Sequence, residues 1–321
     1  MRRTAWCDGP DRVWSPFGGS GARTFRTSLR NTVRAAAWRS RVGQASVGWV
    51  STPAWIELDG VVNMRDVGGL PTVDGGHIFS GRLIRSDNLQ DLPPESVEHL
   101  VEDLGVTDVV DLRTLVEVAK EGEGPLTSRS EVRIHHFTLY PEDSQESGIP
   151  PGERELPWVG DPGDVDGDGR DAAAAPPDHD DYWSGHYLSY LAQRPDSVVA
   201  ALRAIADSPG TVIVHCAAGK DRTGTVVGLA LHLAGATDEA VMADFEASAE
   251  RVPRILERLQ RRPSYAVNLS GKMVDQQSPR ADTMRQLLTV LDTRFGGLES
   301  WLAAQGWTEE DTARLRAKLR D

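Results

Sequence analysis

Cysteine is scarce in this sequence, with only Cys7 and Cys216 in 321 residues. Two cysteines do not make the disulfide framework of a small secreted domain, so we expect a free, reduced thiol at Cys216. No run of about 20 apolar residues is present, which argues against a transmembrane segment. Basic residues are outnumbered, with 35 Lys and Arg against 48 Asp and Glu. This balance argues against nucleic acid as a partner, because a phosphate backbone requires a broad basic face.

Charge is unevenly distributed along the chain. Residues 1–50 contain nine Arg, no Lys and only two Asp, and they lack the continuous apolar core of a secretory signal. We interpret them as a disordered Arg-rich extension, although their composition also superficially suits a transit peptide or an anion-binding arm. The missing signal and the free thiol lead us to expect a cytoplasmic protein, with secretion by another route left open.

A second unusual segment, residues 142–181, contains thirteen acids and two Arg among many Gly, Pro and Ala. Such a composition cannot bury much apolar surface, so we predict an acidic, disordered insert within a domain at 51–321. The stretch 164–169 (DVDGDG) resembles the start of a calcium loop, but Ala175 occupies the position of the bidentate Glu. The loop is incomplete, and we expect no metal or other cofactor.

Hydrophobic patterning predicts an α/β fold. Short β-branched runs are typical of buried strands, whereas a period of three to four residues indicates helices. The predicted strands include 106–112 and 211–215, and the predicted helices are 94–104, 182–206 with a break at Pro195, 223–233 and most of the chain from 238 onward. We therefore expect a central, mostly parallel sheet flanked by helices, with a helical C-terminal region.

The segment 215–224 (HCAAGKDRTG) joins a predicted strand to a predicted helix. A Cys and an Arg six positions apart around a tight loop can face the same phosphate group, with the intervening N–H groups directed at its oxygens. The predicted phosphate contacts are Ala217, Ala218, Gly219, Lys220, Asp221 and Arg222. The segment is therefore expected to form an anion-binding loop.

Each residue type of this loop meets a requirement of phosphate-ester cleavage. Cys216 must attack as a thiolate, which the helix N-terminus and Arg222 would stabilise, and it would form a phosphocysteine. Arg222 offers a planar, bidentate donor to two phosphate oxygens. Thr223 can place its hydroxyl near the sulfur that leaves in the second step. His215 would brace the loop through hydrogen bonds, and Gly219 and Gly224 would allow the close turn and close packing of backbone around the anion.

Other classes of protein use comparable features. Cys216 could be a structural cysteine, but the complete motif between a strand and a helix argues against that interpretation. A phosphate-binding module without turnover has little reason to keep the Cys, Arg and Thr together. A rhodanese-like sulfurtransferase also carries a Cys in an anion-binding loop, but the run 220–224 (KDRTG) fits a phosphatase better.

The loop resembles that of the cysteine phosphatase superfamily. More narrowly, the chain resembles the bacterial tyrosine and dual-specificity phosphatase family, whose members include one that accepts phosphoproteins and phosphoinositides. The further motifs are 63–69 (NMRDVGG) with Arg85-Ser86, then Asp111-Leu112-Arg113 with Glu117, and the segment 295–307. The resemblance covers roughly residues 55 to 320. It implies a cysteine-phosphatase fold and hydrolysis of a phosphorylated protein or a phosphoinositide.

The proton donor is not identified by the sequence, which contains no W-P-D motif. The family resemblance offers Asp221, inside the loop, and Asp111, at a strand end. Asp180 and Asp181, about 35 residues before Cys216, are a positional alternative. Asp221 is equally well explained as a salt-bridge partner of its neighbour Arg222.

Two features bear on substrate access. Lys220 adds a positive charge at the rim of the loop and could favour highly charged substrates such as phosphoinositide head groups, while a solvated surface Lys is the alternative. The resemblance implies that the Arg-rich residues 252–285 form a helical lid. Their simpler interpretation is an exposed basic helix.

Overall fold

The computed structural model describes residues 53–141, 150, 179–269 and 273–320. Contacts divide the chain into two units, Met1–Trp49 and Val50–Asp321, and the described residues belong to the second. The predicted extension 1–50 and the calcium-like stretch 164–169 lie outside the described residues, as does most of the acidic insert. Helix α3 begins at His179, so the predicted insert is too long at its C-terminal end by three residues.

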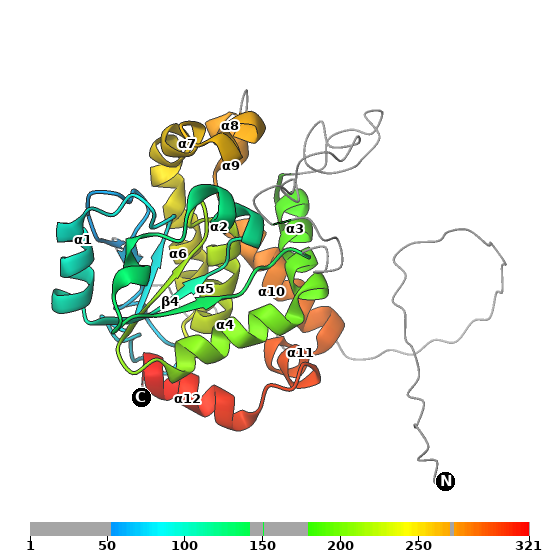
Figure 1. Ribbon diagram of the computed structural model, residues 1–321. Helices are drawn as coiled ribbons and strands as arrows, with labels where there is room; N and C mark the ends of the chain where they lie inside the picture. Colours follow the sequence, from blue (N-terminus) through cyan, green and yellow to red (C-terminus); the bar gives the residue numbers. More distant parts are fainter. Residues whose placement is uncertain (1–52, 142–149, 151–178, 270–272, 321) are drawn as a thin grey trace, which may run out of the picture. The chain divides into compact units, whose positions relative to one another are not determined.

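The described strands form one six-stranded sheet in the order β1-β2-β3-β6-β4-β5. Figure 1 shows the sheet with helices packed around it. They are β1 (Ala54–Trp55), β2 (Arg65–Asp66), β3 (Leu83–Ser86), β4 (Val106–Asp111), β5 (Arg133–His136) and β6 (Thr211–His215). Strands β3, β6, β4 and β5 run parallel, and β1 and β2 add antiparallel at one edge. The predicted α/β fold with a mostly parallel sheet is therefore confirmed.

Both faces of the sheet are covered. In β6, Val212 and Val214 point into the larger hydrophobic core, and Ile213 points into the smaller one on the opposite face. A strand buried on both faces is apolar on both faces, which explains the continuous apolar run 212–214 in the middle of β6. The sequence pattern of β6 is therefore typical of a strand in the centre of a parallel sheet.

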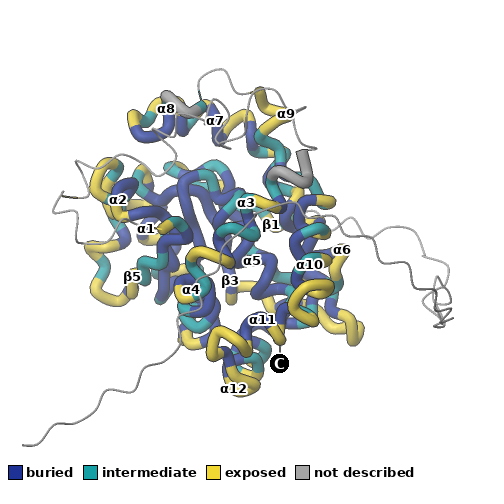
Figure 2. Tube along the Cα trace, turned by 90° about the vertical axis from the view of Figure 1, so that its right-hand side faces the viewer, coloured by how far each residue is buried: buried dark blue, intermediate teal, exposed yellow. Residues whose placement is uncertain are grey.

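Helices supply the rest of the two cores. The larger core contains side chains of α3 (His179–Gln193), α4 (Pro195–Asp207), α5 (Asp221–Leu233), α6 (Asp238–Ala247), α10 (Ala281–Phe295), α11 (Leu298–Ala304) and α12 (Glu309–Leu319). On the smaller core lie α1 (Pro94–Glu98), its π-helical continuation η1 (His99–Asp103) and the 3₁₀ turn η2 (Pro125–Ser128). Figure 2 shows α5 buried within the fold.

The remaining elements lie at the carboxyl ends of the parallel strands. They are α2 (Leu115–Glu121), the 3₁₀ turn η5 (Ser248–Arg251), α7 (Val252–Gln260), α8 (Pro263–Leu269) and α9 (Val274–Gln277). The predicted helices 94–104, 182–206 and 223–233 are confirmed, including the break at Pro195. Among the described residues, no helix is long and apolar enough to cross a membrane.

The sheet register places the motif loop. His215, the last residue of β6, lies opposite Ser86 of β3 on one side and opposite Asp111 of β4 on the other. The loop that starts at Cys216 therefore emerges between two neighbouring strand ends and leads directly into α5. Parallel sheets place their ligand sites at this edge.

Candidate active site

The backbone of the motif loop is held with its carbonyl groups outward. The three hydrogen bonds are Asn88 N to Ala217 O (3.1 Å), Asn63 Nδ2 to Ala218 O (2.9 Å) and Arg85 Nη2 to Gly219 O (3.0 Å). In a trans peptide the N–H points opposite to the preceding carbonyl. The N–H groups of residues 218–220 are therefore directed into the loop, as an anion site requires.

Arg85, which braces this loop, is itself fixed by a buried ion-pair group. Asp244 of α6 pairs with Arg85 and, at 2.9 Å, with Arg65 of the 63–69 motif. All three side chains are buried. Burial favours the neutral form of Asp244, but the charges of Arg65 and Arg85 outweigh it and lower the pKa of this carboxyl below its usual value. The loop is thus anchored to α6.

The two glycines of the loop serve different contacts. Gly219 has φ +66°, and a Cβ there would lie 2.5 Å from backbone atoms of Ser86 and Asp87, so a larger residue would displace the loop from β3. A Cβ at Gly224 would lie 2.8 Å from the Phe245 ring. Gly219 fits the predicted tight turn, whereas Gly224 permits close packing of α5 against α6 rather than against the anion.

Cys216 is a free thiol, buried at the end of β6 and just before the N-terminus of α5. The partial positive charge of a helix N-terminus stabilises a thiolate at such a position. Thr223 lies in the first turn of α5, and its Oγ1 is buried without a hydrogen-bond partner in the described part of the chain. That hydroxyl is therefore not engaged by another described group, and its predicted role toward the sulfur stays a prediction.

Arg222 is oriented by Glu117, a residue of α2. The two guanidinium nitrogens lie 2.6 and 2.9 Å from the two carboxylate oxygens. Burial opposes ionisation of both partners, yet the charge of Arg222 lowers the pKa of Glu117, and Glu117 raises the pKa of Arg222 well above its usual value. The bidentate geometry presents Arg222 to the loop as a fixed positive charge.

Sequence reasoning missed this role of Glu117. Thr114 and Glu117 do form a reciprocal capping box at the start of α2, a pattern that T-x-x-E makes visible in the sequence. The pairing with Arg222, however, joins residues 105 positions apart, and no local signal predicts it. Glu117 also accepts a hydrogen bond from the Tyr265 hydroxyl at 2.9 Å.

The two candidate proton donors lie in different environments. Asp221 opens α5 with a side chain 21% exposed, its Oδ1 accepts a hydrogen bond from Tyr187 at 2.7 Å, and Lys220 Nζ lies 3.5 Å away. Asp111 is buried at the end of β4 and binds Arg113 at 2.6 Å. Burial favours its neutral form, but His215 and Arg113 outweigh this and lower the pKa of Asp111.

His215 contacts the start of the loop and lies near Asp111. His215 Nδ1 lies 3.3 Å from the Cys216 carbonyl oxygen, and its Nε2 lies 3.6 Å from Asp111. Asp180 and Asp181 belong to α3, and their side chains lie outside the described residues. No group of three or more His, Cys, Asp or Glu in the described part of the chain is arranged to hold a metal ion.

Lys220 is buried rather than solvated, so the surface-lysine alternative is wrong. Its Nζ donates to the Gln277 carbonyl at 2.5 Å and lies 4.7 Å from the centre of the Trp183 ring. Both contacts are favourable for a cation removed from water. The ammonium group therefore links the motif loop to α9.

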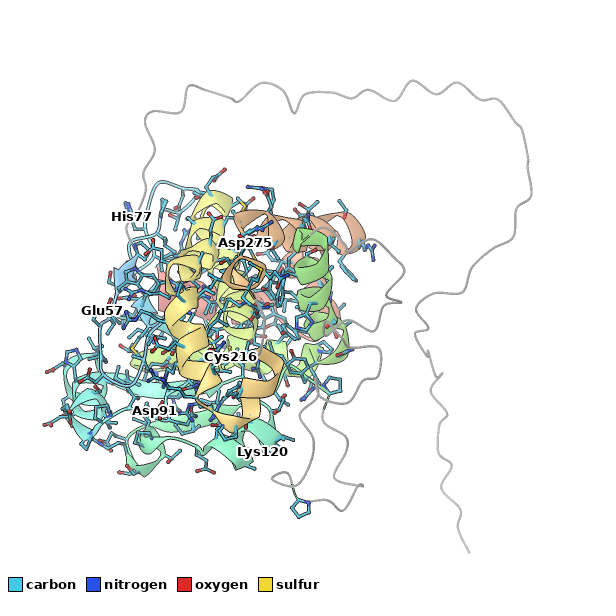
Figure 3. The ribbon with its side chains drawn as sticks, turned by 90° about the horizontal axis from the view of Figure 1, so that it is seen from above. Glu57, His77, Asp91, Lys120, Cys216 and Asp275 are labelled. Atoms are coloured by element: carbon cyan, nitrogen blue, oxygen red, sulfur yellow. The ribbon has the colours of Figure 1, made fainter. Side chains whose placement is uncertain are left out.

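Helices α7, α8 and α9, hereafter the covering helices, pack over the loop (Figures 1 and 3). Ile255, Leu259 and Tyr265 form a small buried cluster with Ala217 of the loop. In Figure 3, Cys216 lies among these yellow and orange segments. An apolar face of α7 is thus buried, which an exposed basic helix would not show.

Ion pairs tie the covering helices to the rim. Arg258 pairs with Asp87 and Asp91, and Arg262 pairs with Asp91 and, at 2.9 Å, with Glu121 of α2. The covering segment is shorter than the predicted 252–285. Its last helix ends at Gln277, and α10 belongs to the larger core, where Met284 is fully buried.

A nucleophilic cysteine after a central parallel strand, a loop of inward N–H groups and an arginine in the next helical turn define a cysteine-dependent phosphatase. The chain belongs to the tyrosine phosphatase family, whose model matches residues 56–321. It is accordingly a phosphoric monoester hydrolase of the protein-tyrosine-phosphatase type, and it acts on phosphorylated substrates.

Similar proteins include the triple specificity protein phosphatase PtpB of Mycobacterium tuberculosis, which is 29% identical over 82% of this chain and 98% of that protein. A tyrosine-protein phosphatase of Nostoc commune is 28% identical over 43% of this chain and 46% of its own length. The crystal structure of P. aeruginosa TpbA aligns at 14% identity with a TM-score of 0.25, covering 66% of this chain and 89% of that one.

Proposed function

We propose that the enzyme cleaves phosphomonoesters through a phosphocysteine, with Asp221 as the proton donor. The Cys216 thiolate attacks phosphorus, the phosphorus–oxygen bond breaks, and Asp221 gives its proton to the departing oxygen. Arg222 and the N–H groups of residues 218–220 bind the charge that develops on the phosphoryl oxygens. The arrangement of inward N–H groups around Cys216 is the observation that carries this proposal.

The second step reverses these roles. Water attacks the phosphorus of the phosphocysteine, and the Asp221 carboxylate accepts its proton. The phosphorus–sulfur bond breaks, inorganic phosphate leaves, and the Cys216 thiolate is regenerated. The Thr223 hydroxyl, which has no other partner among the described residues, stabilises the departing sulfur.

Asp221 suits the proton transfer better than Asp111 does. Asp111 is buried and bound bidentately by Arg113, so giving it a proton would break a buried ion pair. We assign Asp111 the task of orienting His215 at the start of the loop. Asp221 adjoins Arg222 and is partly exposed, so a substrate oxygen can reach it.

The substrate is proposed to be a phosphorylated protein or a phosphoinositide. A relative that aligns over most of this chain carries triple specificity in its name. Lys220 supplies a second cation beside Arg222, which favours substrates that carry more than one negative charge. Comparing kcat/KM for phosphotyrosine peptides, phosphoserine peptides and phosphoinositides would show which class of substrate the enzyme prefers.

We further propose that the covering helices act as a lid. They bury the loop, and they contact Glu117 through Tyr265 and Lys220 through Gln277. A phosphorylated side chain can reach Cys216 only when these contacts part. The closed arrangement keeps water from the thiol between turnovers.

The experiment that tests the reaction is hydrolysis of p-nitrophenyl phosphate by the wild type and Cys216→Ser in the presence of EDTA, with vanadate as inhibitor. Cys7→Ser is the matched control, because Cys7 is the second cysteine of the chain. Activity that survives EDTA and Cys7→Ser but disappears with Cys216→Ser supports the covalent mechanism. A folded, inactive wild type that still binds vanadate would indicate a binding module, and turnover of thiosulfate would indicate a sulfurtransferase.

Residence in the cytoplasm is also a proposal, and it is supported by the free thiol at Cys216. A nucleophilic thiolate is kept reduced in a reducing compartment. Fractionation of the source cells, followed by immunoblotting, tests it, and recovery from the culture medium would contradict it.

A further inference from the structure

Tyr187 of α3 makes the shortest contact of the Asp221 carboxylate. Its hydroxyl donates to Asp221 Oδ1 at 2.7 Å. Tyr187 lies within the predicted helix 182–206, and its separation of 34 positions from Asp221 hides the pairing from the sequence. The hydroxyl is the one polar atom of this side chain, and it is aimed at the acid of the motif loop.

The Tyr187 ring is held rigidly. It is buried in the larger core, its centroid lies 6.1 Å from that of Tyr190 and 6.1 Å from that of Trp183, and Phe245 packs edge-on at 5.9 Å. A tyrosine has only two side-chain torsions, and a close-packed ring loses both. Tyr190 and Phe245, which belong to the core of the domain, therefore fix the ring from two sides, whereas Trp183 also donates to Gln276 of the covering helices at 3.3 Å.

The second neighbour of the Asp221 carboxylate, Lys220, is bound directly to the covering helices. Lys220 Nζ lies 3.5 Å from Asp221 Oδ1, but it also donates to Gln277 of the covering helices. When these helices move, Lys220 loses that partner and is free to turn toward substrate phosphate. Tyr187 is the partner of Asp221 that persists.

We propose that Tyr187 is a positioning residue for proton transfer: its hydroxyl holds Oδ1 of Asp221 and leaves Oδ2 directed at the leaving-group oxygen. This inference rests on the proposed role of Asp221 as the proton donor. In the described part of the chain, Oδ2 accepts no hydrogen bond, whereas Oδ1 has both neighbours. A carboxyl group anchored through one oxygen needs no reorientation before it donates through the other.

The test compares two aryl phosphates of different leaving group. 2,4-Dinitrophenolate departs without a proton, whereas the phenolate of phenyl phosphate is a strong base and requires one. The ratio of the two kcat/KM values therefore reports proton transfer in the cleavage step, and kcat/KM for the dinitrophenyl ester reports the fold and the loop. A residue that only supported the fold would lower both values together.

For Tyr187→Phe we expect kcat/KM with phenyl phosphate to fall about tenfold, near the upper end of the effect of losing one hydrogen bond to a neutral group, and the dinitrophenyl value to stay within about twofold. Asp221→Asn should lower the phenyl phosphate value about 100-fold or more, with a much smaller effect on the dinitrophenyl ester. Adding Tyr187→Phe to Asp221→Asn should cause no further selective loss. Tyr190→Phe is the matched control, since its hydroxyl bonds to His186 on the same helix and to Tyr140, and not to Asp221.

The outcomes distinguish the role of Asp221 as proton donor from the positioning role of Tyr187. If Asp221→Asn is selective and Tyr187→Phe is not, the positioning role is overturned while Asp221 remains the donor. If Asp221→Asn is not selective either, the donor assignment fails, and the inference about Tyr187 falls with it. An equal loss with both esters in Tyr187→Phe would show a structural role only.

Discussion

Charged and titratable side chains around Cys216 are buried in matched pairs. Arg222 is bound by Glu117, and Asp111 is bound by Arg113. Removing one member of such a pair leaves an uncompensated buried charge, which costs about 3–5 kcal/mol. His215 has no comparable partner, because its nearest carboxylate oxygen, on Asp111, is 3.6 Å away. Protonation of His215 is therefore expected to change the free energy of unfolding.

His215 should make the protein less stable as the pH falls. Burial lowers the pKa of His215 from 6.5 to about 4, with Asp111 opposing the shift. Between these values the unfolded chain binds a proton that the folded protein does not, so the free energy of unfolding decreases with falling pH. Between pH 7.5 and pH 5, the wild type should lose about 2 kcal/mol more than His215→Asn does.

Urea unfolding at the two pH values measures this difference. The control for replacing a histidine is His77→Asn, because His77 lies at an exposed position. Equal losses in the wild type and in His215→Asn would show that folding does not lower the pKa of His215.

At the scale of elements, α7 shows why a basic amphipathic helix permits two interpretations. Its buried side chains, Val252, Ile255, Leu256 and Leu259, have the spacing of one helical face. The two arginines that directly follow α7 differ in their surroundings. Arg261 is 74% exposed and pairs with Glu257 of α7, whereas its neighbour Arg262 is 13% exposed and pairs with α2.

We expect Arg262→Ala to loosen the covering helices. Loss of the pairs with Asp91 and Glu121 should weaken the closed state by about 1 kcal/mol, and kcat/KM for a phosphotyrosine peptide should rise about fivefold. The measurement compares initial rates of the wild type, Arg262→Ala and the control Arg261→Ala, with the control unchanged. A fall in activity, or an equal rise in both variants, would contradict a lid held by these contacts.

At the scale of the whole molecule, the catalytic residues all belong to the unit Val50–Asp321, and the family match begins at residue 56. We therefore predict that a chain starting at Val50 retains kcat/KM for p-nitrophenyl phosphate within about twofold, because the contacts that position the site lie within one domain. Steady-state kinetics and thermal unfolding of the two chains check this. A loss of activity would assign residues 1–49 a part in catalysis.

Removal of Glu309–Asp321 is the contrasting truncation. Leu315 and Leu319 of α12 are fully buried, and Lys318 donates to the Ser208 carbonyl at 2.8 Å. Each lost leucine contact is expected to cost about 2–5 kcal/mol, so this shorter chain should unfold at a much lower temperature.

Much of the local structure follows from the sequence. The short, β-branched segment 211–215 predicted a buried strand, and the apolar pattern after it predicted α5, because both elements are encoded by the periodicity of neighbouring residues. The same reasoning identified Cys216 and Arg222, since strand, loop and helix are contiguous and the spacing alone brings the two residues to one anion. The order of the sheet was predicted only as mostly parallel.

Only the tertiary structure decided which distant side chains complete the site. Glu117 reaches Arg222 across 105 positions, Tyr187 reaches Asp221 across 34, and Tyr265 reaches Glu117 across 148. Each of these residues has a sufficient local explanation, as a helix cap or an apolar helical position, so its sequence neighbours do not reveal the second role. Contacts of this kind depend on how the helices pack against the sheet, whereas the nucleophile and its loop depend on one continuous segment of chain.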